Sequence, residues 1–247
     1  MKKFIAPILL TSLFSLTTSS AIASETAWKY EGKQGSAHWG ELSEKFGLCA
    51  TGVNQSPINI TSVIEANLPP LAINYHKSQI SEINNGHTVQ ANIIGNNTFT
   101  NDAGTFDLLQ FHFHAPSENT IEGKSFPLEA HFVHADQGGR LAVIGVMFEL
   151  GKENSELAKL WENMPENSHS QATLLKELSA LNLMPKEKSY YRFNGSLTTP
   201  PCTEGVRWFV LKDTIKASKS QIEKFRTVMG TDTNRPVQPI NARVILQ

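Results

Sequence analysis

The sequence predicts a β-dominated α+β fold, a single domain that carries a few short surface helices. Turn-forming runs of Asn, Asp and Gly recur at short intervals, as at 84–86, 95–97 and 101–104. The segments between them are short and rich in Val, Ile, Phe and Thr, which favour strands. Helical periodicity appears only in the C-terminal part. Neither an internal repeat nor a low-complexity linker divides the chain, so we expect one domain.

Composition excludes several functional classes. The 247 residues include 22 basic and 23 acidic side chains, with a formal net charge of −1 and 40% hydrophobic residues. Such a composition is globular, which excludes wholesale disorder, collagen and coiled coils. The near-neutral charge argues against a basic face that binds nucleic acid. Two cysteines are too few for a disulfide-dense scaffold or a four-cysteine zinc site.

The N-terminal residues have the pattern of a signal peptide. Lys2 and Lys3 form a positive region, residues 4–16 are apolar, and Ala21-Ile22-Ala23 places small residues where a signal peptidase cleaves. We therefore predict that residues 1–23 are removed by cleavage after Ala23.

Residues 24–247 are then predicted to form a soluble, exported domain. We expect it in the periplasm, with secretion as the second choice. The alternative is an uncleaved N-terminal anchor, but the apolar run is shorter than the roughly 20 residues that a membrane span needs. Elsewhere in the chain, we expect no membrane span.

Export changes the interpretation of the two cysteines. In an oxidising compartment, Cys49 and Cys202 favour a disulfide over free thiols. The alternative is a pair of buried thiols. A nucleophilic role has no support from a local motif around either residue.

Three helices are predicted in the second half of the chain. Apolar residues within 157–161 fall at i, i+3 and i+4, and four leucines within 174–181 lie on one helical face. The third helix is predicted over 220–230, where Ser220 and Glu223 form a capping box and a glycine provides the stop.

The most informative stretch is residues 110–114, with the sequence QFHFH. Its period-2 alternation is typical of a strand, on which His112 and His114 point to one face. His131 follows His114 after 16 intervening residues, within the similarly alternating segment EAHFV at 129–133. If the two strands are neighbours, His131 completes a set of three imidazoles. Three neutral histidines with one open position are typical of a catalytic zinc site.

Each predicted ligand strand also carries a hydrogen-bond acceptor. Gln110 and Glu129 lie on the ligand face, each two residues before a histidine. Because a ligating histidine usually donates its other ring N–H to such an acceptor, we predict this role for both. The alternative is that the histidines form ordinary hydrogen bonds on a polar strand face and bind no metal. Structural or surface roles are assigned to the remaining histidines His38, His76, His134 and His169.

A series of motifs lies in order along nearly the whole mature chain. They are Ala37 to Gly40, Asn54 to Ile60, Asn84 to His87, Gln110 to His114, Pro116 to Glu118, Glu129 to His134, Ser196 to Cys202 and Arg235 to Pro239. Together they resemble the α-class carbonic anhydrases, specifically the exported bacterial branch. The resemblance implies a large, mostly antiparallel, twisted central sheet of about ten strands, with zinc at the base of a conical cleft. It also implies that Cys49 and Cys202 pair.

The activity implied by the resemblance is the reversible hydration of CO₂ to bicarbonate and a proton. One Zn²⁺ per chain would be held by His112, His114 and His131, and zinc-bound hydroxide would attack CO₂. The pKa of the bound water, about 7, is the general value for carbonic anhydrases. Thr198 matches the gatekeeper, which accepts a hydrogen bond from the hydroxide and donates one to Glu118, because an ionised carboxylate only accepts.

His87 matches the family's proton shuttle. Unassisted release from an acid of pKa about 7 is limited to about 10²–10³ s⁻¹, well below the carbonic anhydrase turnover of about 10⁶ s⁻¹. Histidine has the pKa that such a relay needs. The alternative for His87 is a turn histidine with no catalytic part. Tyr30, Asn85, Gln90 and Thr199 would line the polar side and hold bridging waters.

CO₂ is apolar, and the resemblance places a mainly apolar wall beside the zinc. The matching substrate-pocket residues are Val133, Val143, Leu197, Thr199, Val206 and Trp208. Val133 has independent support because it shares a strand face with His131. For each of the apolar residues the alternative is ordinary core packing.

Two other functions compete with the lyase. One is a non-catalytic binding module on the same fold, against which the complete histidine triad argues. The other is a zinc hydrolase acting on esters; the sequence reveals no leaving-group acid, which leaves ester cleavage as a side activity. The partners implied are CO₂ and bicarbonate, sulfonamide and anion inhibitors, and a second copy in a homodimer, with no nucleic acid.

Overall fold

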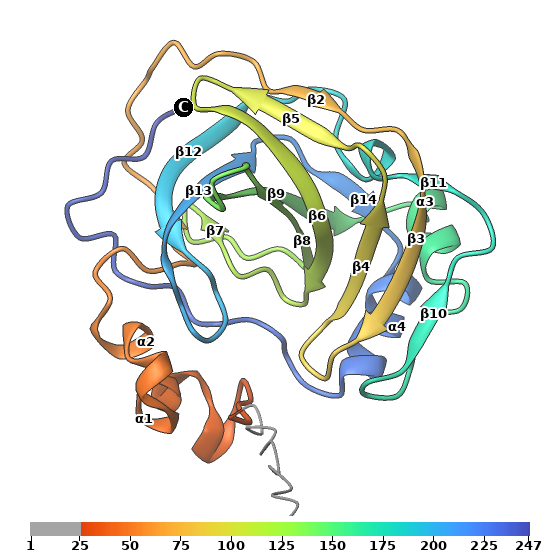
Figure 1. The fold of residues 1–247 in the computed structure, drawn as a ribbon, viewed down its shortest axis with the longest axis horizontal. Helices are drawn as coiled ribbons and strands as arrows, with labels where there is room; N and C mark the ends of the chain where they lie inside the picture. Colours follow the sequence, from red (N-terminus) through yellow and green to blue (C-terminus); the bar gives the residue numbers. More distant parts are fainter. Residues whose placement is uncertain (1–25) are drawn as a thin grey trace, which may run out of the picture.

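The computed structural model describes residues 26–247 (Figure 1). The predicted signal peptide at 1–23 and its cleavage site lie outside these residues. Within the described part, one large sheet dominates and a two-stranded sheet lies beside it. In the same part, we find no helix with the length and apolar character needed to cross a membrane.

The large sheet has twelve strands. They are β2 (Ala72–Asn74), β3 (Lys77–Asn84), β4 (Val89–Ile94), β5 (Thr98–Asn101), β6 (Gly104–His114), β8 (Leu128–Ala135), β9 (Leu141–Leu150), β10 (Gln171–Thr173), β11 (Leu178–Ser179), β12 (Tyr190–Ser196), β13 (Glu204–Leu211) and β14 (Ile215–Ala217). The small sheet pairs β1 (Asn59–Ile60) with β7 (Thr120–Ile121) in parallel.

The main path through the large sheet is β10-β3-β4-β6-β8-β9-β13-β12. Adjacent strands along this path are antiparallel, except that β9 and β13 are parallel. Off the path, β14 also pairs with β9 in parallel. The prediction of a β-dominated single domain with a mostly antiparallel twisted sheet is confirmed, with twelve strands where about ten were expected. Figure 1 shows β6 and β8 crossing the middle of the molecule, where the sequence placed the histidines.

The helices are short. The α-helices are α1 (Trp39–Leu42), α2 (Leu48–Thr51), α3 (Ser155–Leu160) and α4 (Lys219–Met229), and the 3₁₀ turns are η1 (Gly32–Gln34), η2 (Ser36–His38), η3 (Glu44–Phe46) and η4 (Ala180–Leu183). The first five of these elements along the chain precede the sheet. Helices α3 and α4 contribute apolar side chains to the larger hydrophobic core.

The two faces of the sheet bury different clusters because side chains alternate along each strand. On β6, Phe111 and Phe113 are fully buried in the larger core. On β8, Phe132 belongs to that core and Val133 to a second cluster on the opposite face. The histidines of β6 share the face of the second cluster, so the site has a packed aromatic layer behind it.

Two of the three predicted helices are confirmed. Helix α3 begins after Asn154, whose side chain accepts hydrogen bonds from the first-turn N–H groups. Helix α4 ends at Gly230, in the left-handed conformation with φ of 69°. The predicted cap of α4 is wrong by two residues: Ser218 caps it and forms the capping box with Gln221, which places Ser220 inside the helix.

The predicted helix over 174–181 is wrong. Residues 174–177 form neither helix nor strand, residues 178–179 form β11 beside β3, and η4 begins at residue 180. The backbone of this segment bonds to β3 instead of to itself, with Leu174 N–H donating to the Ile80 carbonyl. The leucines also lie in different surroundings, because Leu178 is 2% exposed and Leu175 is 90% exposed. Pairing with a strand that is distant in sequence therefore outweighs the local helical pattern.

Cys49 and Cys202 form a disulfide, as predicted, with an S–S distance of 2.08 Å. The bond joins α2 to the turn before β13 across a sequence separation of 153 residues. It lies in a small cluster with Tyr30 and Trp39. Polar side chains hold the backbone at both ends, since Gln55 Nε2 donates to the Cys202 carbonyl and Arg235 Nη2 to the Cys49 carbonyl, each over 3.0 Å.

Reduction of this disulfide is expected to lower the free energy of unfolding by up to about 5 kcal/mol, because so long a closed loop restricts the unfolded chain strongly. Thermal unfolding with and without a reductant measures the effect. The double variant Cys49→Ser/Cys202→Ser is the control and should melt at one temperature under both conditions. An unchanged melt, with two thiols open to alkylation in the untreated protein, would contradict the link.

Glu82 on β3 is a buried carboxyl away from the histidines. Its side chain is 1% exposed. Within the described residues, neither carboxylate oxygen has a hydrogen-bond partner. Burial raises the pKa of Glu82 to about 8, and the positive charge of Lys224 opposes the rise only in part.

The folded protein therefore holds a proton on Glu82 that the unfolded chain releases above its ordinary pKa of 4.5. The free energy of unfolding should fall by about 1.4 kcal/mol per pH unit as pH rises from about 4.5 to about 8, and then level off. Glu82→Gln should be more stable than the parent by about 3–5 kcal/mol above pH 8 and equal to it near pH 4. Urea unfolding across pH checks this, with the exposed Glu162→Gln as the matched control. Parallel stability curves for the parent and Glu82→Gln would contradict it.

Candidate active site

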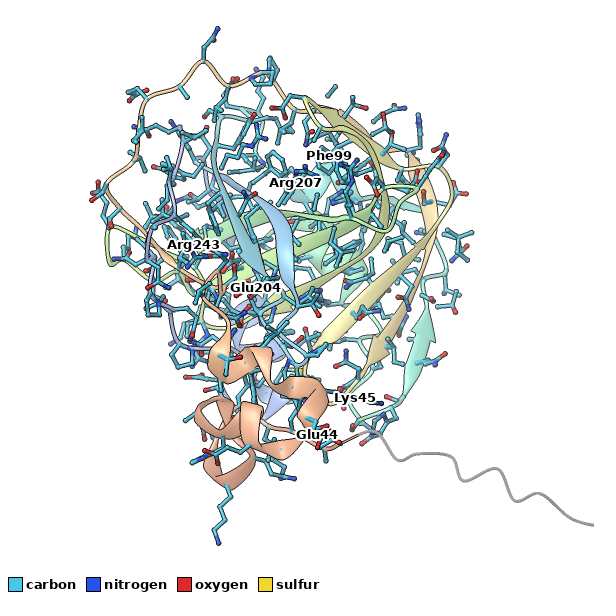
Figure 2. The ribbon with its side chains drawn as sticks, turned by 60° about the vertical axis from the view of Figure 1, so that its left-hand side comes forward. Glu44, Lys45, Phe99, Glu204, Arg207 and Arg243 are labelled. Carbon is cyan, nitrogen blue, oxygen red and sulfur yellow. A yellow bond between two sulfur atoms is a disulfide. The ribbon has the colours of Figure 1, made fainter. Side chains whose placement is uncertain are left out.

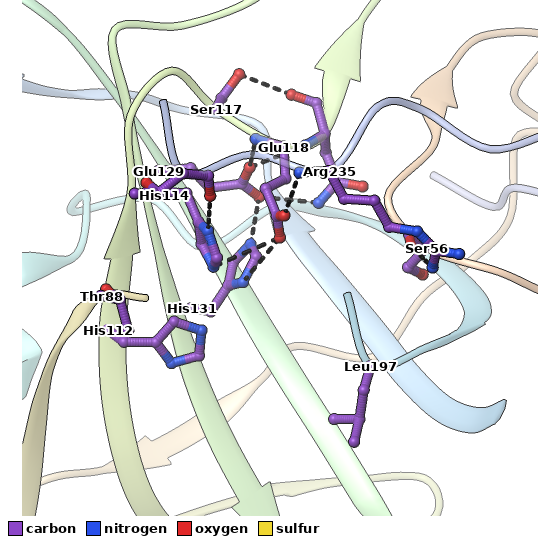
Figure 3. Close-up of polar contacts among 12 residues, drawn as sticks. Ser56, Thr88, His112, His114, Ser117, Glu118, Glu129, His131, Leu197 and Arg235 are labelled. Atoms are coloured by element: carbon purple, nitrogen blue, oxygen red, sulfur yellow. Dashed lines mark hydrogen bonds and ion pairs between the residues drawn. The ribbon is translucent and has the colours of Figure 1, made fainter. Parts of the chain in front are cut away.

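Three histidines converge on one point at the centre of the sheet (Figure 3). His112 and His114 come from β6 and His131 from β8, and His112 lies directly opposite His131 in the strand register. One ring nitrogen from each can be chosen so that all three lie within 4.8 Å of one another. The strand pattern and the pairing together therefore produce the predicted cluster.

The other ring nitrogen of each histidine lies within 3.0 Å of an acceptor oxygen, although at His131 this contact is an ion pair without hydrogen-bond geometry. His112 Nδ1 lies 2.8 Å from Gln110 Oε1. His131 Nε2 lies 3.0 Å from Glu129 Oε1. The structure thus brings both predicted acceptors to their histidines. Their contacts leave His112 Nε2 and His131 Nδ1 for the shared point.

The third acceptor was missed by the sequence analysis. His114 Nδ1 lies 2.5 Å from the backbone carbonyl of Thr233. A backbone carbonyl has no signature in the sequence because every residue carries one. The remaining nitrogen, His114 Nε2, is buried and has no hydrogen-bond partner within the described residues. A buried nitrogen lone pair facing two other imidazoles is what a metal ion would satisfy.

The surroundings favour the neutral imidazoles that a metal requires. Burial lowers the pKa of His112, and the neighbouring His114 and His131 lower it further. Burial and His114 likewise lower the pKa of His131. Burial also lowers the pKa of His114, although the Thr233 carbonyl and Glu129 oppose it. The donor set of three neutral imidazoles fits Zn²⁺.

A loop fixes the acceptor Glu129. Its Oε2 accepts hydrogen bonds from the backbone N–H groups of Glu118 and Asn119, over 2.8 and 2.9 Å. Its Oε1 accepts one from Asn119 Nδ2 over 2.9 Å. Asn119 was missed in the sequence analysis. These bonds hold the carboxylate that orients His131.

Glu118 and Thr198, the predicted orienting pair, are close to each other. Burial raises the pKa of Glu118, whereas the backbone N–H of Arg235 and, to a smaller extent, the nearby Thr198 hydroxyl lower it. The Arg235 N–H donates to Glu118 Oε1 over 2.8 Å. Glu118 Oε2 lies 3.4 Å from His114 Nε2. Both side chains are buried, so their arrangement is fixed beside the histidines.

Arg235 anchors this arrangement to the rest of the fold, and its role was not foreseen. The guanidinium is 2% exposed. Its Nη1 donates to Gln55 Oε1 over 2.8 Å and to the Ser56 carbonyl over 2.9 Å. Its Nη2 donates to the Cys49 carbonyl over 3.0 Å. Arg235 therefore connects the segment that holds the disulfide to the backbone that holds Glu118.

His87, the predicted shuttle, stacks on an aromatic residue that the sequence analysis missed. The rings of His87 and Trp28 are 3.6 Å apart and inclined by 8°. Trp28 also makes edge contacts with Tyr30 and Trp39. Asn85 Oδ1 accepts hydrogen bonds from the backbone N–H groups that follow it, including that of His87. The Asn85 side chain oxygen is thus committed to the turn that presents His87.

The other polar residues predicted for the cleft differ in their burial and in their hydrogen-bond partners. Gln90 on β4 lies opposite His112 in the register, but its Nε2 donates to Asn92 over 2.7 Å. Tyr30 is buried, and burial together with the charge of Glu118 raises its pKa. Thr199 is half-buried and its carbonyl accepts from Cys202 N–H.

The predicted apolar wall forms one cluster beside the histidines. Its buried members, with Leu197 packed against them, are Val133, Val143, Val206 and Trp208. The Trp208 ring lies 4.9 Å from that of His131. The wall is contributed by β8, β9 and β13, which are neighbours in the sheet.

The remaining histidines lie apart from the cluster, as predicted. His134 is fully buried on the other face, with Nε2 2.5 Å from the Tyr75 hydroxyl and Nδ1 3.2 Å from the Ala142 carbonyl. These contacts make it a structural residue. The exposed ones are His38, His76 and His169.

Comparison with known proteins agrees with this geometry. Residues 34–247 match the sequence profile of the family described as Eukaryotic-type carbonic anhydrase. A carbonic anhydrase from Neisseria gonorrhoeae is 48% identical over 238 residues, which cover 95% of this chain and 94% of that protein. The structure of the Photobacterium profundum alpha-carbonic anhydrase superposes with a TM-score of 0.85 at 50% identity, covering 90% of this chain and 100% of that one.

A second solved structure is the complex of the alpha-carbonic anhydrase from Thermovibrio ammonificans with the inhibitor sulfanilamide. It has a TM-score of 0.89 and 48% identity, and covers 90% of this chain and 100% of that one. The coverage is nearly complete in both directions. The chain therefore belongs to the eukaryotic-type, or alpha-class, carbonic anhydrase family.

Proposed function

We propose that one Zn²⁺ per chain, held by His112, His114 and His131, supports the reversible hydration of CO₂ to bicarbonate and a proton. The observation that carries this proposal is the set of three ligand nitrogens within 4.8 Å of one another, all in the described part of the chain. When bound, zinc lowers the pKa of a water molecule, to about 7 in carbonic anhydrases generally. The complete triad argues against a non-catalytic binding module.

Thr198 and Glu118 would set the direction of the hydrogen bonds beside the metal. An ionised carboxylate only accepts hydrogen bonds, so the Thr198 hydroxyl must donate to Glu118. The Thr198 oxygen is then left to accept a hydrogen bond from a water molecule at the metal. Arg235 supports Glu118 in this state through its backbone N–H and its positive charge.

The apolar cluster would bind CO₂, which offers no strong hydrogen-bond acceptor or charge. Trp208 and Val143 lie on neighbouring strands in direct register and form part of one wall. This wall would exclude water from one side of the three histidines, and the polar side would keep the water through which protons leave.

His87 would accept the proton and pass it to buffer. An imidazole is suited to this step because its ordinary pKa is near 6.5. The Asn85 turn fixes the backbone of His87, and Trp28 provides a flat surface for its ring. We propose Trp28 as a positioning residue for the shuttle.

Further properties follow from the proposed zinc site. The Thermovibrio ammonificans relative binds sulfanilamide, and we expect sulfonamides and small anions to inhibit this chain by taking the open position at the metal. Slow ester cleavage is expected as a side activity. We also propose that residues 1–23 are removed after Ala23, that the enzyme acts in the periplasm, and that it forms a homodimer.

Removal of the metal tests the proposed function directly. Dialysis against a strong chelator should yield a protein with less than about a tenth of an equivalent of zinc and a hydration rate near that of buffer. Addition of one equivalent of Zn²⁺ should restore the rate, and magnesium, which prefers oxygen ligands, should not. Zinc content by atomic absorption and stopped-flow CO₂ hydration provide the readouts. Full activity in the zinc-free protein would refute the proposal.

A further inference from the structure

A cavity of about 760 Å³ lies at the end of the sheet, where β12 and β13 meet the C-terminal residues 242–246. The C-terminal residues are held there by a bridge between Leu246 and Arg192. Figure 2 labels three residues of this region, Glu204, Arg207 and Arg243. Among the described residues that line the cavity there is no carboxylate, but there are four arginines, Arg140, Arg192, Arg207 and Arg243.

The arginines of this cavity are separate from the histidine site. Successive side chains on β13 point to opposite faces of the sheet. Trp208 packs against His131, so Arg207 points to the other face. Opposite Arg207 in the register are Asn194 on β12 and Ala142 on β9, and Asn194 also lines the cavity.

Two of the four arginines have their charge paired. Arg140 Nε lies 2.5 Å from Asp136 Oδ2. Arg192 Nη1 lies 2.7 Å from Asp102 Oδ2. These two guanidinium groups therefore contribute hydrogen-bond donors more than net charge.

The other two arginines have no carboxylate in contact. Arg243 donates from Nε to the Ile240 carbonyl over 2.9 Å, from Nη1 to that of Asn194 over 3.2 Å and from Nη2 to that of Pro239 over 2.6 Å. Neutral carbonyls fix the guanidinium without cancelling its charge. Within the described residues, the Arg207 side chain forms no hydrogen bond or ion pair, although the residue is half-buried.

Glu204 is the carboxylate that acts on this pair from outside the lining. Its charge raises the pKa of Arg243, against the lowering by burial. Its Oε1, however, accepts from the Asn54 backbone N–H over 2.7 Å and from Gln55 Nε2 over 3.0 Å. Glu204 thus offsets part of the positive charge and leaves an excess in the cavity.

We propose that this cavity binds a phosphate group, either as free phosphate or carried by a small organic molecule. A guanidinium group places two parallel N–H donors against the oxygens of such an anion. Arg243 is already immobilised by three carbonyls, which reduces the entropy lost on binding. The volume exceeds that of phosphate alone and leaves room for an organic group.

The test uses the zinc-loaded enzyme and the variant Arg207→Gln, which replaces a guanidinium group that forms no hydrogen bond or ion pair within the described residues. Inorganic phosphate and glycerol phosphate are titrated calorimetrically at constant ionic strength, which holds general screening fixed. The parent should saturate with both or with one of them, and Arg207→Gln should bind about tenfold more weakly, as expected for a lost charged hydrogen bond. The matched control is Arg226→Gln, which replaces an exposed arginine on α4 that is paired with Asp232. This variant should bind phosphate like the parent.

Stopped-flow CO₂ hydration separates this site from the metal. Arg207→Gln should keep the parent rate, and phosphate that binds at the metal would still inhibit it. Tighter binding of glycerol phosphate than of phosphate would identify an organic ligand, and the reverse would identify free phosphate. Equal affinity of Arg207→Gln and the parent, an equal loss in Arg226→Gln, or no saturation of the parent by either phosphate would each overturn the proposal.

Discussion

Replacement of His112 by alanine is expected to abolish stoichiometric zinc binding and to lower CO₂ hydration by more than about 10³-fold. Loss of an acceptor such as Gln110 typically costs 10–100-fold in metal affinity or activity in zinc proteins, so loss of a ligand must cost more. The remaining His114 and His131 offer two nitrogens, too few for a catalytic zinc site. Zinc content and stopped-flow hydration measure the two effects on the same sample.

The matched control for this variant is His38→Ala, because His38 is exposed and contacts Glu41 rather than any of the three histidines. It should retain one zinc per chain and the parent rate. His112→Ala should also keep a cooperative unfolding transition, since the packing behind the site comes from Phe111 and Phe113 on the opposite strand face. A folded His112→Ala protein with full zinc and full activity would refute the ligand assignment.

Replacement of His87 by alanine is expected to lower turnover in weak buffer to about 10²–10³ s⁻¹, the limit for unassisted proton release from an acid of pKa about 7. Relative to the carbonic anhydrase turnover of about 10⁶ s⁻¹, this is a loss of about 10³–10⁴-fold. Added imidazole should restore most of the rate, because it carries the proton that His87 no longer accepts. Zinc content should be unchanged, since His87 is not a ligand.

The control for the shuttle is His76→Ala, which removes an exposed histidine on another part of the surface. Its rate should be independent of imidazole. Measurement of hydration at several buffer concentrations separates proton transfer from CO₂ conversion, since only the first depends on buffer. If His87→Ala and the parent respond identically to buffer and imidazole, His87 is not the shuttle.

The strand that carries His112 and His114 could be predicted because the alternation of side chains along it depends only on neighbouring residues in the sequence. The alternation in QFHFH places His112 and His114 on one face and the phenylalanines on the other. The same alternation placed Glu129 two residues before His131. Strand pairing then adds the register, in which His112 lies opposite His131. The disulfide was predictable because only two cysteines are present.

The leucine-rich segment at 174–181 shows the limit of a local pattern. Its spacing matches a helix, yet β3 provides backbone partners that the isolated segment lacks. The capping box predicted for α4 is wrong by only two residues. Ser218 and Ser220 are each followed, three residues later, by a side chain that can complete a capping box, and the folded path of the chain makes Ser218 the cap.

The sequence by itself determined the three clustered histidines, the acceptors Gln110 and Glu129 beside them, and the β-dominated class, since each depends on side-chain type and on a period of two along a strand. Only the tertiary structure decided the contacts of Arg235, the stacking of Trp28 on His87 and the support of His114 by the Thr233 carbonyl. Such contacts join residues far apart in the chain, often through backbone groups that every residue carries. Their free energies depend on distances that exist only once the sheet has formed.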